Sequence, residues 1–366
     1  MKPTALVIGG TGPTGPPLAL GLQARGFDVT LLHSGRHELA EVAHFRHLHA
    51  DVYNEDSLAA ILNDERFDVA VASYGRLRSI AEVLVGKVGR MISIGGVPAY
   101  RGYFDPALHN PAGLPVPTNE SADTSTEDED AKSYRIRRTE EMVFEHHPTA
   151  THFRYPWVYG PRQIAPREWS IVRRIQDKRP FLILPDDGLA LITFGYTENL
   201  AHALLCAVDH PVESMGEIFN CGDDECLTVR QVVEIVADEL GHGFELISMP
   251  GHLAIPARPL MMSYMNTHRV LDTSKLQTRL GYRDVVPARQ ALRLTARWLA
   301  ENPHTPGSVA EIAIEDPFDY AAEDRLVAWW RAAVGAPPQL DYAVEPGFGK
   351  GYAGPGTNYV RSDKRI

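Results

Sequence analysis

The chain has 366 residues, of which 44% are hydrophobic and 23% charged, so it is long enough for two domains or for one large domain carrying a smaller one. Its formal net charge of −11 argues against a nucleic acid or an anionic membrane as partner, because phosphate contacts need clustered lysines and arginines. The three cysteines have no CxxC spacing and the apolar runs are too short for a membrane span, so we expect a cytoplasmic protein without disulfides, structural zinc or a secretory signal.

Short β-branched or apolar runs alternate along the chain with longer helical patterns, which predicts a parallel sheet with crossover helices. The expected strands are, in chain order, Ala5–Gly9, Asp28–His33, Arg46–Ala50, Asp68–Ser73, Arg90–Gly95 and Ala150–Tyr155. The expected helices lie near Pro16–Arg25, Asp56–Asn63, Ser79–Val85 and Tyr134–Glu145, and residues Asn54 to Asp56 supply the caps of the second one. With right-handed crossovers this is an α/β protein with a Rossmann-type, doubly wound parallel sheet and a smaller C-terminal substrate lobe.

The first expected strand runs into a glycine-rich turn, residues 9–15 (GGTGPTG), and then into a helix. Gly9 allows a sharp turn, Gly12 lets backbone N–H groups approach a pyrophosphate, and Gly15 lets the helix pack closely on the sheet. The helix N-terminus, beginning at Thr14, presents N–H groups and a partial positive charge to an anion. Two prolines in the first turn lead us to expect that the regular helix begins slightly late. This order predicts a dinucleotide-binding site.

We expect the dinucleotide-binding domain to span residues 1–161, with 191–223 contributing to it. The substrate lobe is then discontinuous, made of 162–190 and 224–300, and residues 301–366 form a C-terminal extension. Residues 100–130 are rich in proline, asparagine, serine and acid, and indicate a long loop beside the site or a mobile, solvated segment. The glycine-rich tail, residues 346–356, lacks the features of a phosphate loop and is interpreted as an extended arm.

The GxxGxxG spacing resembles that of the extended short-chain dehydrogenase/reductases, also called the NAD-dependent epimerase/dehydratase family. Further segments similar to this family are Val29–Arg36, Ala50–Val52, Arg154–Arg162, Phe194–Ala201, Gly216–Gly222 and Leu280–Tyr282. The resemblance covers about residues 4–300 and implies a nicotinamide cofactor and a homodimer. It places Asp51 beside the adenine. The other residues that we assign to the cofactor from these strand ends are Val52, Ser73, Tyr155, Trp157 and Val158.

The end of the second strand bears on the choice between NAD and NADP. NAD enzymes of this family usually have Asp or Glu there, accepting hydrogen bonds from the ribose hydroxyls. Here the position is His33, followed by Ser34 and then Arg36. Because no carboxylate at that position repels a 2′-phosphate and Arg36 could pair with one, the sequence favours NADP. The alternative is that Arg36 is a solvent-facing loop residue.

The catalytic pattern departs from the family. Members of the family transfer the proton with the tyrosine of a YxxxK helix, and the lysine of this motif also binds the nicotinamide ribose. A Ser or Thr after the fifth strand holds the substrate oxygen. Here the helix offers Tyr134 and Arg138, so we assign proton transfer to Tyr134 and the ribose contact to Arg138, although a guanidinium does not shuttle protons. Gly96 stands at the Ser or Thr position. The oxygen could be held by Tyr100, by an Asn or Ser of residues 118–126, or by backbone N–H groups.

Histidines also gather around the third expected strand. His47 and His49 alternate onto one of its faces and His44 precedes it. We interpret all three as partly exposed histidines and predict no metal site.

Three functional hypotheses follow from these residues. The first is an NADP-dependent oxidoreductase that transfers hydride between nicotinamide and a carbonyl or alcohol carbon. Its substrate would be small and partly apolar, because the lobe is rich in large apolar side chains, Trp169, Phe181, Met261, Met262, Tyr264 and Met265. The alternatives are a nucleotide-sugar epimerase or dehydratase that retains its NAD, and a non-catalytic cofactor-sensing or RNA-associated protein of the same fold.

Overall fold

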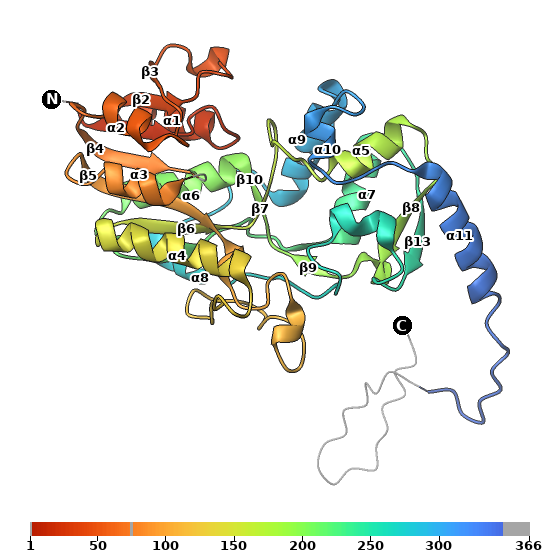
Figure 1. Ribbon diagram of the computed structural model, residues 1–366. Coiled ribbons are helices and arrows are strands. Elements are labelled where there is room, and N and C mark those ends of the chain that lie inside the picture. Colours follow the sequence, from red (N-terminus) through yellow and green to blue (C-terminus); the bar gives the residue numbers. More distant parts are fainter. Residues whose placement is uncertain (1, 74–75, 347–366) are drawn as a thin grey trace, which may run out of the picture. The chain divides into compact units, whose positions relative to one another are not determined.

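In the computed structural model, residues 2–73 and 76–346 are described (Figure 1). The chain divides into two compact units, residues 1–318 and 319–366. The first unit is built on a seven-stranded sheet in the spatial order β11-β6-β5-β4-β1-β2-β3. Its strands are β1 (Thr4–Ile8), β2 (Asp28–His33), β3 (Arg46–His49), β4 (Phe67–Ala72), β5 (Val88–Gly96), β6 (Thr151–Tyr155) and β11 (Ile218–Asn220).

The sheet is parallel and doubly wound, as predicted. Every neighbouring pair of strands is parallel. From β1 the chain builds outward to β3, then returns to β4 on the other side of β1 and continues to β11. Ligands of open α/β sheets bind outside the carboxyl ends of the strands at such a reversal of order. The fold therefore directs attention to the loops after β1, β2, β4 and β5.

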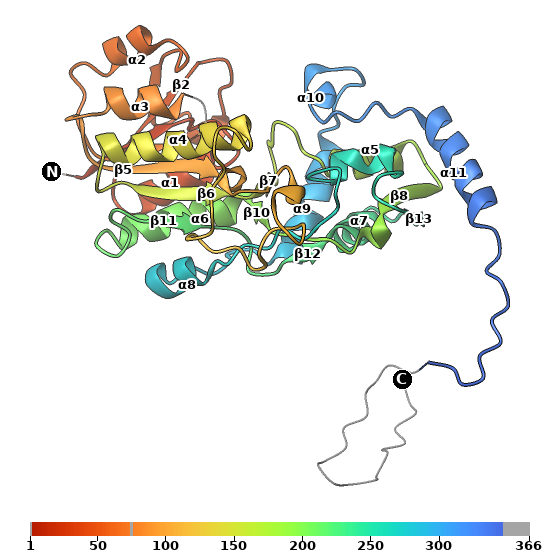
Figure 2. The same cartoon turned by 60° about the horizontal axis from the view of Figure 1, so that its bottom comes forward.

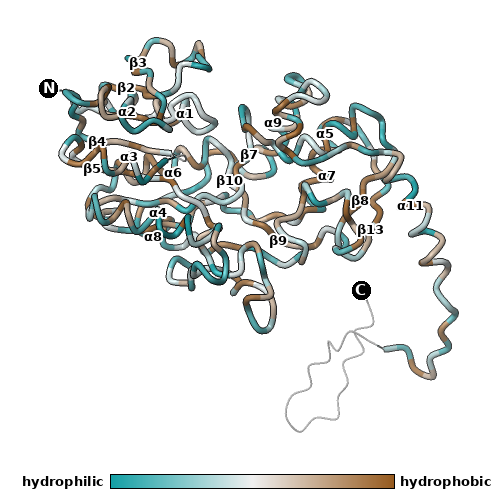
Figure 3. The backbone as a smooth tube through the Cα atoms, viewed as in Figure 1, coloured by the Kyte–Doolittle hydropathy of each residue, from teal (hydrophilic) through white to brown (hydrophobic). Residues whose placement is uncertain are grey.

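Helices cover both faces of this sheet. The helices α2 (Glu55–Ile61), α3 (Leu77–Val83) and α4 (Ala131–His146) lie on one face, and α1 (Gly15–Ala24) and α6 (Thr197–Asp209) on the other (Figure 2). Successive residues of a strand point to opposite faces, and β1 divides accordingly. Ala5 and Val7 join the buried cluster under α1 and α6, and Leu6 and Ile8 the cluster under α2 and α3. The hydrophobic strands β2, β4 and β5, labelled on the left of Figure 3, belong to this sheet, which is thus buried from both sides.

A third buried cluster forms a smaller lobe in the same unit. Its main elements are α5 (Trp169–Gln176), β8 (Phe181–Pro185), α7 (Val229–Glu239), β13 (Glu245–Met249) and α9 (Ala288–Glu301). Short elements complete it and link it to the sheet, namely β7 (Trp157–Tyr159), β9 (Leu191–Ile192), β10 (Phe194–Tyr196), β12 (Leu227–Thr228) and α10 (Val309–Ile312). The helix α8 (Ser274–Leu280) packs instead on the sheet, with Leu276 and Leu280 in the cluster under α1 and α6. The domain boundaries that we expect at 161, 190, 223 and 300 stay a prediction.

Two of the residues expected to line an apolar pocket in this lobe lie in different surroundings. Trp169 is fully buried, and its Nε1 donates a hydrogen bond to Glu311 Oε1 at 3.1 Å. Tyr264, in contrast, is 63% exposed and donates its hydroxyl to Asp105 Oδ1. One side chain therefore belongs to the core and the other to the surface, and the apolar pocket stays a prediction.

The predicted elements are present with shifts of at most three residues at their ends. β2 has the predicted bounds, and α2 is capped as expected for the asparagine before it, since Asn54 Oδ1 accepts from Ser57 N–H at 3.0 Å. The late start expected for α1 was wrong. The helix begins at Gly15, because its two prolines occupy early positions whose N–H groups need no helical acceptor.

The segment 100–130 is a long loop packed on the protein. A short 3₁₀ turn, η2 (Val97–Ala99), precedes it, and a second, η3 (Pro106–Leu108), lies within it. The segment buries Tyr100, Tyr103 and Leu114 in a small cluster. Backbone hydrogen bonds tie it down, such as Thr118 N–H to Val270 O at 2.8 Å. It therefore forms a wall beside the end of β5.

The second unit contains α11 (Tyr320–Val334), whose N-terminus is capped by the Asp319 side chain. The glycine-rich arm predicted at 346–356 lies, from residue 347 on, outside the described residues. Among the helices of residues 2–73 and 76–346, none combines the length and the apolar character needed to cross a membrane.

Candidate active site

The glycine turn after β1 has the predicted geometry. Gly9 has φ +89°, a left-handed conformation that favours glycine, and its N–H donates to Leu32 O at 2.9 Å. A Cβ on Gly9 would overlap Ser73 Oγ, which itself donates to Ile8 O at 3.0 Å. The structure thus brings two predicted cofactor residues, Gly9 and Ser73, into contact at the switch point of the sheet.

The start of α1 is packed tightly on one side and open on the other. A Cβ on Gly15 would overlap the Gly10 carbonyl, so this glycine is required for packing. A Cβ on Gly12 would meet only Gly9 O, at 3.2 Å, and would otherwise point into open space. A ligand can therefore approach the backbone at Gly12. Because Pro13 carries no N–H, the Thr14 N–H is a donor on which an anion at this turn would depend.

The end of β2 differs from expectation in one respect. His33 is buried, while Ser34 and Arg36 are exposed. The loop after the strand turns back and places the Glu38 carboxylate 3.9 Å from His33 Nε2. The argument that no carboxylate lies near the end of β2 was therefore wrong. The carboxylate is that of Glu38, five residues after His33, and a motif for the strand end does not extend that far. Arg36 would attract a 2′-phosphate and Glu38 would repel it.

The remaining predicted cofactor residues do not all face one space. Asp51 is exposed after β3 and accepts from Tyr53 N–H at 2.9 Å, with Val52 packed partly into the core. Tyr155 is buried in the cluster under α1 and α6. Trp157 is nearly buried too, and Arg167 stacks 3.2 Å from its ring centre. The nearby Val158 accepts at its carbonyl oxygen from Gln163 Nε2 at 2.8 Å. These three side chains thus support the sheet and the lobe.

The two catalytic candidates lie on α4. Tyr134, in the first turn, is half-buried, and its backbone N–H donates to Asp130 O. Arg138 follows one turn later, but its guanidinium forms a close ion pair with Glu141. This pair raises the pKa of Arg138, and the charge of Tyr134 is near enough to add to the effect. Arg138 is therefore paired with a carboxylate that the YxxxR pattern does not reveal.

At the end of β5 the hydroxyl groups are mostly engaged. Gly96 is buried opposite Tyr155, and Tyr100 is 1% exposed with its hydroxyl donating to Asn220 Oδ1 at 2.7 Å. Burial raises the pKa of Tyr100. Ser125, from the segment predicted as an alternative source of a hydroxyl, is fully buried, and its Oγ has no partner among the described residues. Its backbone N–H donates to Ala99 O at 3.1 Å, which holds it beside the end of β5.

A buried ion pair fixes α4 to the sheet. Glu140 accepts two hydrogen bonds from Arg154, at 2.8 and 2.7 Å, and both side chains are 4% exposed. Burial alone would raise the pKa of Glu140, but Arg154 and the nearby His152 lower it to about 2. The Arg154 guanidinium also lies over the Tyr100 ring, 4.6 Å from its centre. Sequence reasoning missed this pair, although the arginine lies in a segment it quoted.

A pocket of about 480 Å³ opens between α3 and α4 above the end of β5. Its floor includes Ile94 and Gly95, and its walls are side chains of α4 (Ile136, Thr139, Met142) and of the segment 76–82. The sequence patterns did not predict this pocket. Neither Tyr134 nor Arg138 lines this pocket.

Comparisons with known proteins agree with the fold. Residues 122–222 match the NAD dependent epimerase/dehydratase family, and this stretch includes three of the segments quoted above but not the glycine turn. The uncharacterized protein YbjS of Escherichia coli is 27% identical over 144 residues, 34% of this chain and 43% of that protein. A 3beta-hydroxysteroid-dehydrogenase/decarboxylase of Arabidopsis thaliana is 25% identical over 168 residues, 38% of this chain and 29% of that protein. The chain thus spans less than half the length of these curated relatives.

Among solved structures, a dTDP-glucose 4,6-dehydratase from Bacillus anthracis in complex with NAD superposes with a TM-score of 0.63 at 15% identity. The match covers 82% of this chain and 97% of that one. The comparisons therefore agree with the resemblance stated from the motifs: the chain shares the fold of this solved dehydratase, and its residues 122–222 match the NAD dependent epimerase/dehydratase family.

Proposed function

We propose that the chain is a nicotinamide-dinucleotide-dependent oxidoreductase acting on a carbonyl or alcohol group of a small molecule. The observation that carries the proposal is the glycine turn after β1, in which a Cβ on Gly12 would meet only Gly9 O, at 3.2 Å, while Gly9 and Gly15 are packed against Ser73 and Gly10. Such a turn leaves a backbone cradle at the one place where the strand order reverses. The family match at 122–222 supports a cofactor of this class.

The residues present fit a dinucleotide. Thr14 and the start of α1 would hold the pyrophosphate through backbone N–H groups and the helix dipole. The adenosine end would lie at β2, beside Ser34 and Arg36, with Asp51 on the neighbouring strand end. Arg36 favours NADP and Glu38 favours NAD, so the choice between the two depends on these two exposed side chains.

A bound nicotinamide supplies or accepts the hydride at the substrate carbon. Tyr134 then donates its hydroxyl proton to the carbonyl oxygen during reduction and takes it back during oxidation. Arg138, one turn along the same helix, would orient the nicotinamide ribose. The Ser125 hydroxyl is our candidate for the group that replaces the Ser or Thr absent at Gly96, because it is buried beside β5 without a partner among the described residues.

The second candidate is a nucleotide-sugar epimerase or dehydratase, favoured by solved structures of that kind with the same fold. The hydroxysteroid dehydrogenase among the curated relatives favours the first candidate and a partly apolar substrate. Retention of the cofactor separates the two. An enzyme that returns the hydride within each turnover keeps its NAD through purification, whereas an oxidoreductase exchanges it.

The test is a titration of the full chain with NADH and with NADPH, followed by nicotinamide fluorescence. We expect saturable binding of at least one dinucleotide, and Arg36→Ala weakens NADPH more than NADH because it removes the partner of a 2′-phosphate. The matched control is Arg66→Ala, an exposed arginine away from β2. Binding of neither dinucleotide contradicts the proposal.

Proton transfer is tested separately in a screen of carbonyl substrates. Tyr134→Phe should lower kcat by about a hundredfold or more while dinucleotide binding persists, since general acid–base groups contribute about that much. Tyr342→Phe, an exposed tyrosine of the second unit, is the control. Turnover that survives in Tyr134→Phe would assign the proton transfer to another group.

A further inference from the structure

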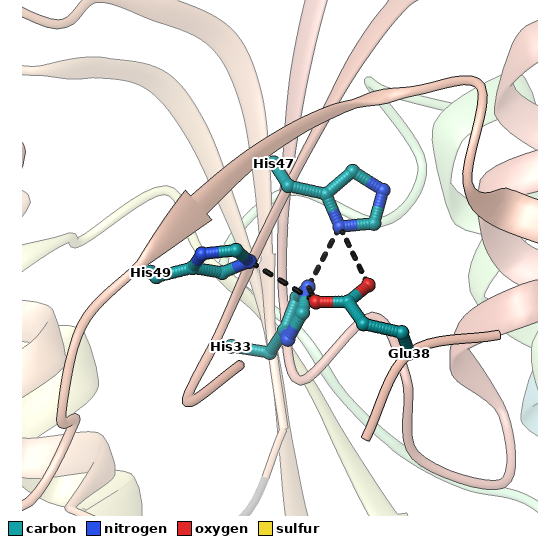
Figure 4. A group of neighbouring side chains, drawn as sticks. All are labelled: His33, Glu38, His47 and His49. Atoms are coloured by element: carbon teal, nitrogen blue, oxygen red, sulfur yellow. Dashed lines mark hydrogen bonds and ion pairs between the residues drawn. The ribbon is translucent and has the colours of Figure 1, made fainter. Parts of the chain in front are cut away.

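Four side chains that could bind a metal ion meet at the ends of β2 and β3 (Figure 4). His33 ends β2 and pairs directly with His49 on β3, and His47 lies two residues before His49 on the same face. Glu38 reaches them from the loop after β2. The sequence patterns considered above missed this group, because two of its members lie in a different segment from the three histidines that stand close in the sequence.

Their spacing matches the ligand shell of a small cation. The donor atoms lie within 4.8 Å of one another. His33 Nε2 is 2.8 Å from His47 Nδ1, and the Glu38 carboxylate is 3.5 Å from His47 Nδ1 and 3.2 Å from His49 Nε2. Ligands bound tetrahedrally to Zn²⁺ at about 2.0–2.1 Å stand about 3.3 Å from one another. The group therefore needs only small movements to surround one ion.

A hydrogen bond prepares His47 for this arrangement, whereas His33 must change its tautomer. His47 Nε2 donates to Val42 O at 3.0 Å, which leaves Nδ1 as the lone-pair atom facing the group, as in a metal ligand oriented by an outer partner. His33 Nδ1 accepts from Gly35 N–H at 3.1 Å, so without an ion the His33 proton lies on Nε2 and points at His47. An ion displaces this proton, and Gly35, exposed and at φ +76°, can turn its N–H away as the ring changes tautomer.

Two of the four side chains are buried and two are exposed, which suits binding of an ion from solution. The side chains of His33 and His47 are 5% and 12% exposed, whereas those of Glu38 and His49 are about half exposed. Two ligands are thus held by the sheet and two can admit an ion from solvent. We infer that this group is a binding site for a divalent transition-metal ion of the Zn²⁺ type, with the ligands His33, Glu38, His47 and His49. Imidazole nitrogens with one carboxylate are a donor set that suits zinc.

The experiment uses the full chain without a polyhistidine tag, stripped of metal by a chelator and free of dinucleotide. Co²⁺ is titrated in as a visible probe, and Zn²⁺ is then added to displace it. We expect one equivalent of Co²⁺ to bind with the intense visible absorption of tetrahedral coordination, and Zn²⁺ to remove that absorption. Because no cofactor is present, the result is independent of the proposed oxidoreductase function.

Variants then assign the ligands. His49→Ala and Glu38→Gln should each weaken Co²⁺ binding by about a hundredfold, since even the loss of an outer partner costs about 10–100-fold. Both side chains are half exposed, so these variants should keep the circular dichroism of the wild type. The control is His44→Ala, an exposed histidine whose Nε2 contacts Gln23 and which lies outside the group. Absence of saturable Co²⁺ binding, or wild-type binding by both folded variants, overturns the site.

Discussion

The two ends of the candidate active site are built differently. At the β1–β2 end the site consists mainly of backbone, namely the turn at residues 9–15 with its open space at Gly12. At the β5–α4 end it consists of side chains that already hold one another: Arg154 with Glu140, Tyr100 with Asn220, and Arg138 with Glu141. The first end leaves backbone groups accessible to a ligand. In the second end the side chains are paired with one another, and Tyr134 is not part of these pairs.

This difference explains why a motif succeeds at one end and misleads at the other. Glycine spacing specifies backbone conformation directly, because positive φ values and close approaches admit few other residues. A YxxxR pattern specifies only that two side chains share a helix face. Which partner each one chooses depends on residues elsewhere in the fold, such as Glu141 beside Arg138. If the two ends are independent, a substitution that destabilises one end should leave the ligand-binding property of the other intact.

The largest effect is expected from Glu140→Gln at the side-chain end. The substitution leaves the Arg154 guanidinium buried without its counter-charge, so the free energy of unfolding should fall by about 3–5 kcal/mol at pH 7. Dinucleotide binding at the glycine turn should persist in the fraction that remains folded. Chemical denaturation measures the loss, and Glu145→Gln, exposed on the same helix, is the control.

The same pair predicts a pH dependence. The pKa of Glu140 lies at about 2 in the folded protein against 4.5 ordinarily, because Arg154 and His152 outweigh the cost of burial. A lowered carboxyl pKa contributes stability that is complete above pH 4.5 and is lost as the pH falls towards 2, and this gap corresponds to about 3 kcal/mol. The stability difference between wild type and Glu140→Gln should therefore shrink from pH 5 to pH 2. A difference that stays constant over this range contradicts the assignment.

Sequence alone predicted the sheet, the doubly wound order and the glycine turn, since these follow from local periodicity and backbone constraints. It placed β2 at its observed bounds and the cap of α2 at Asn54. It did not find Glu38 beside His33, the partner of Arg138, or the Glu140–Arg154 pair. In each case the packing of a loop or helix brings an acidic side chain next to a basic one. A pattern within one segment of the sequence does not show which acidic and basic residues will pair.

A pair of alanine substitutions separates packing from binding within the backbone end. Gly15→Ala would put a Cβ onto the Gly10 carbonyl and should lower the free energy of unfolding by about 1–3 kcal/mol, as overpacking does. Gly12→Ala brings a Cβ to 3.2 Å from Gly9 O, a tight contact but not an overlap, so it should lower the free energy of unfolding by less than Gly15→Ala does, while abolishing dinucleotide binding. Gly243→Ala, where a Cβ meets nothing within 4 Å, is the control for both. If Gly12→Ala binds NADH and NADPH like the wild type, the cradle is not at this turn.

The smallest effect is expected from Glu141→Gln, which tests whether a side chain of the β5–α4 end can contribute to dinucleotide binding. Removing this carboxylate releases Arg138 from its ion pair and leaves the guanidinium free to face the nicotinamide ribose. Exposed ion pairs contribute little, so the melting temperature should not change, and dinucleotide affinity should rise by no more than about twofold. Fluorescence titration against Glu145→Gln measures this rise. Equal affinity in the two variants would mean that Arg138 does not reach the ribose, and the side-chain end would then act on the substrate through Tyr134 alone.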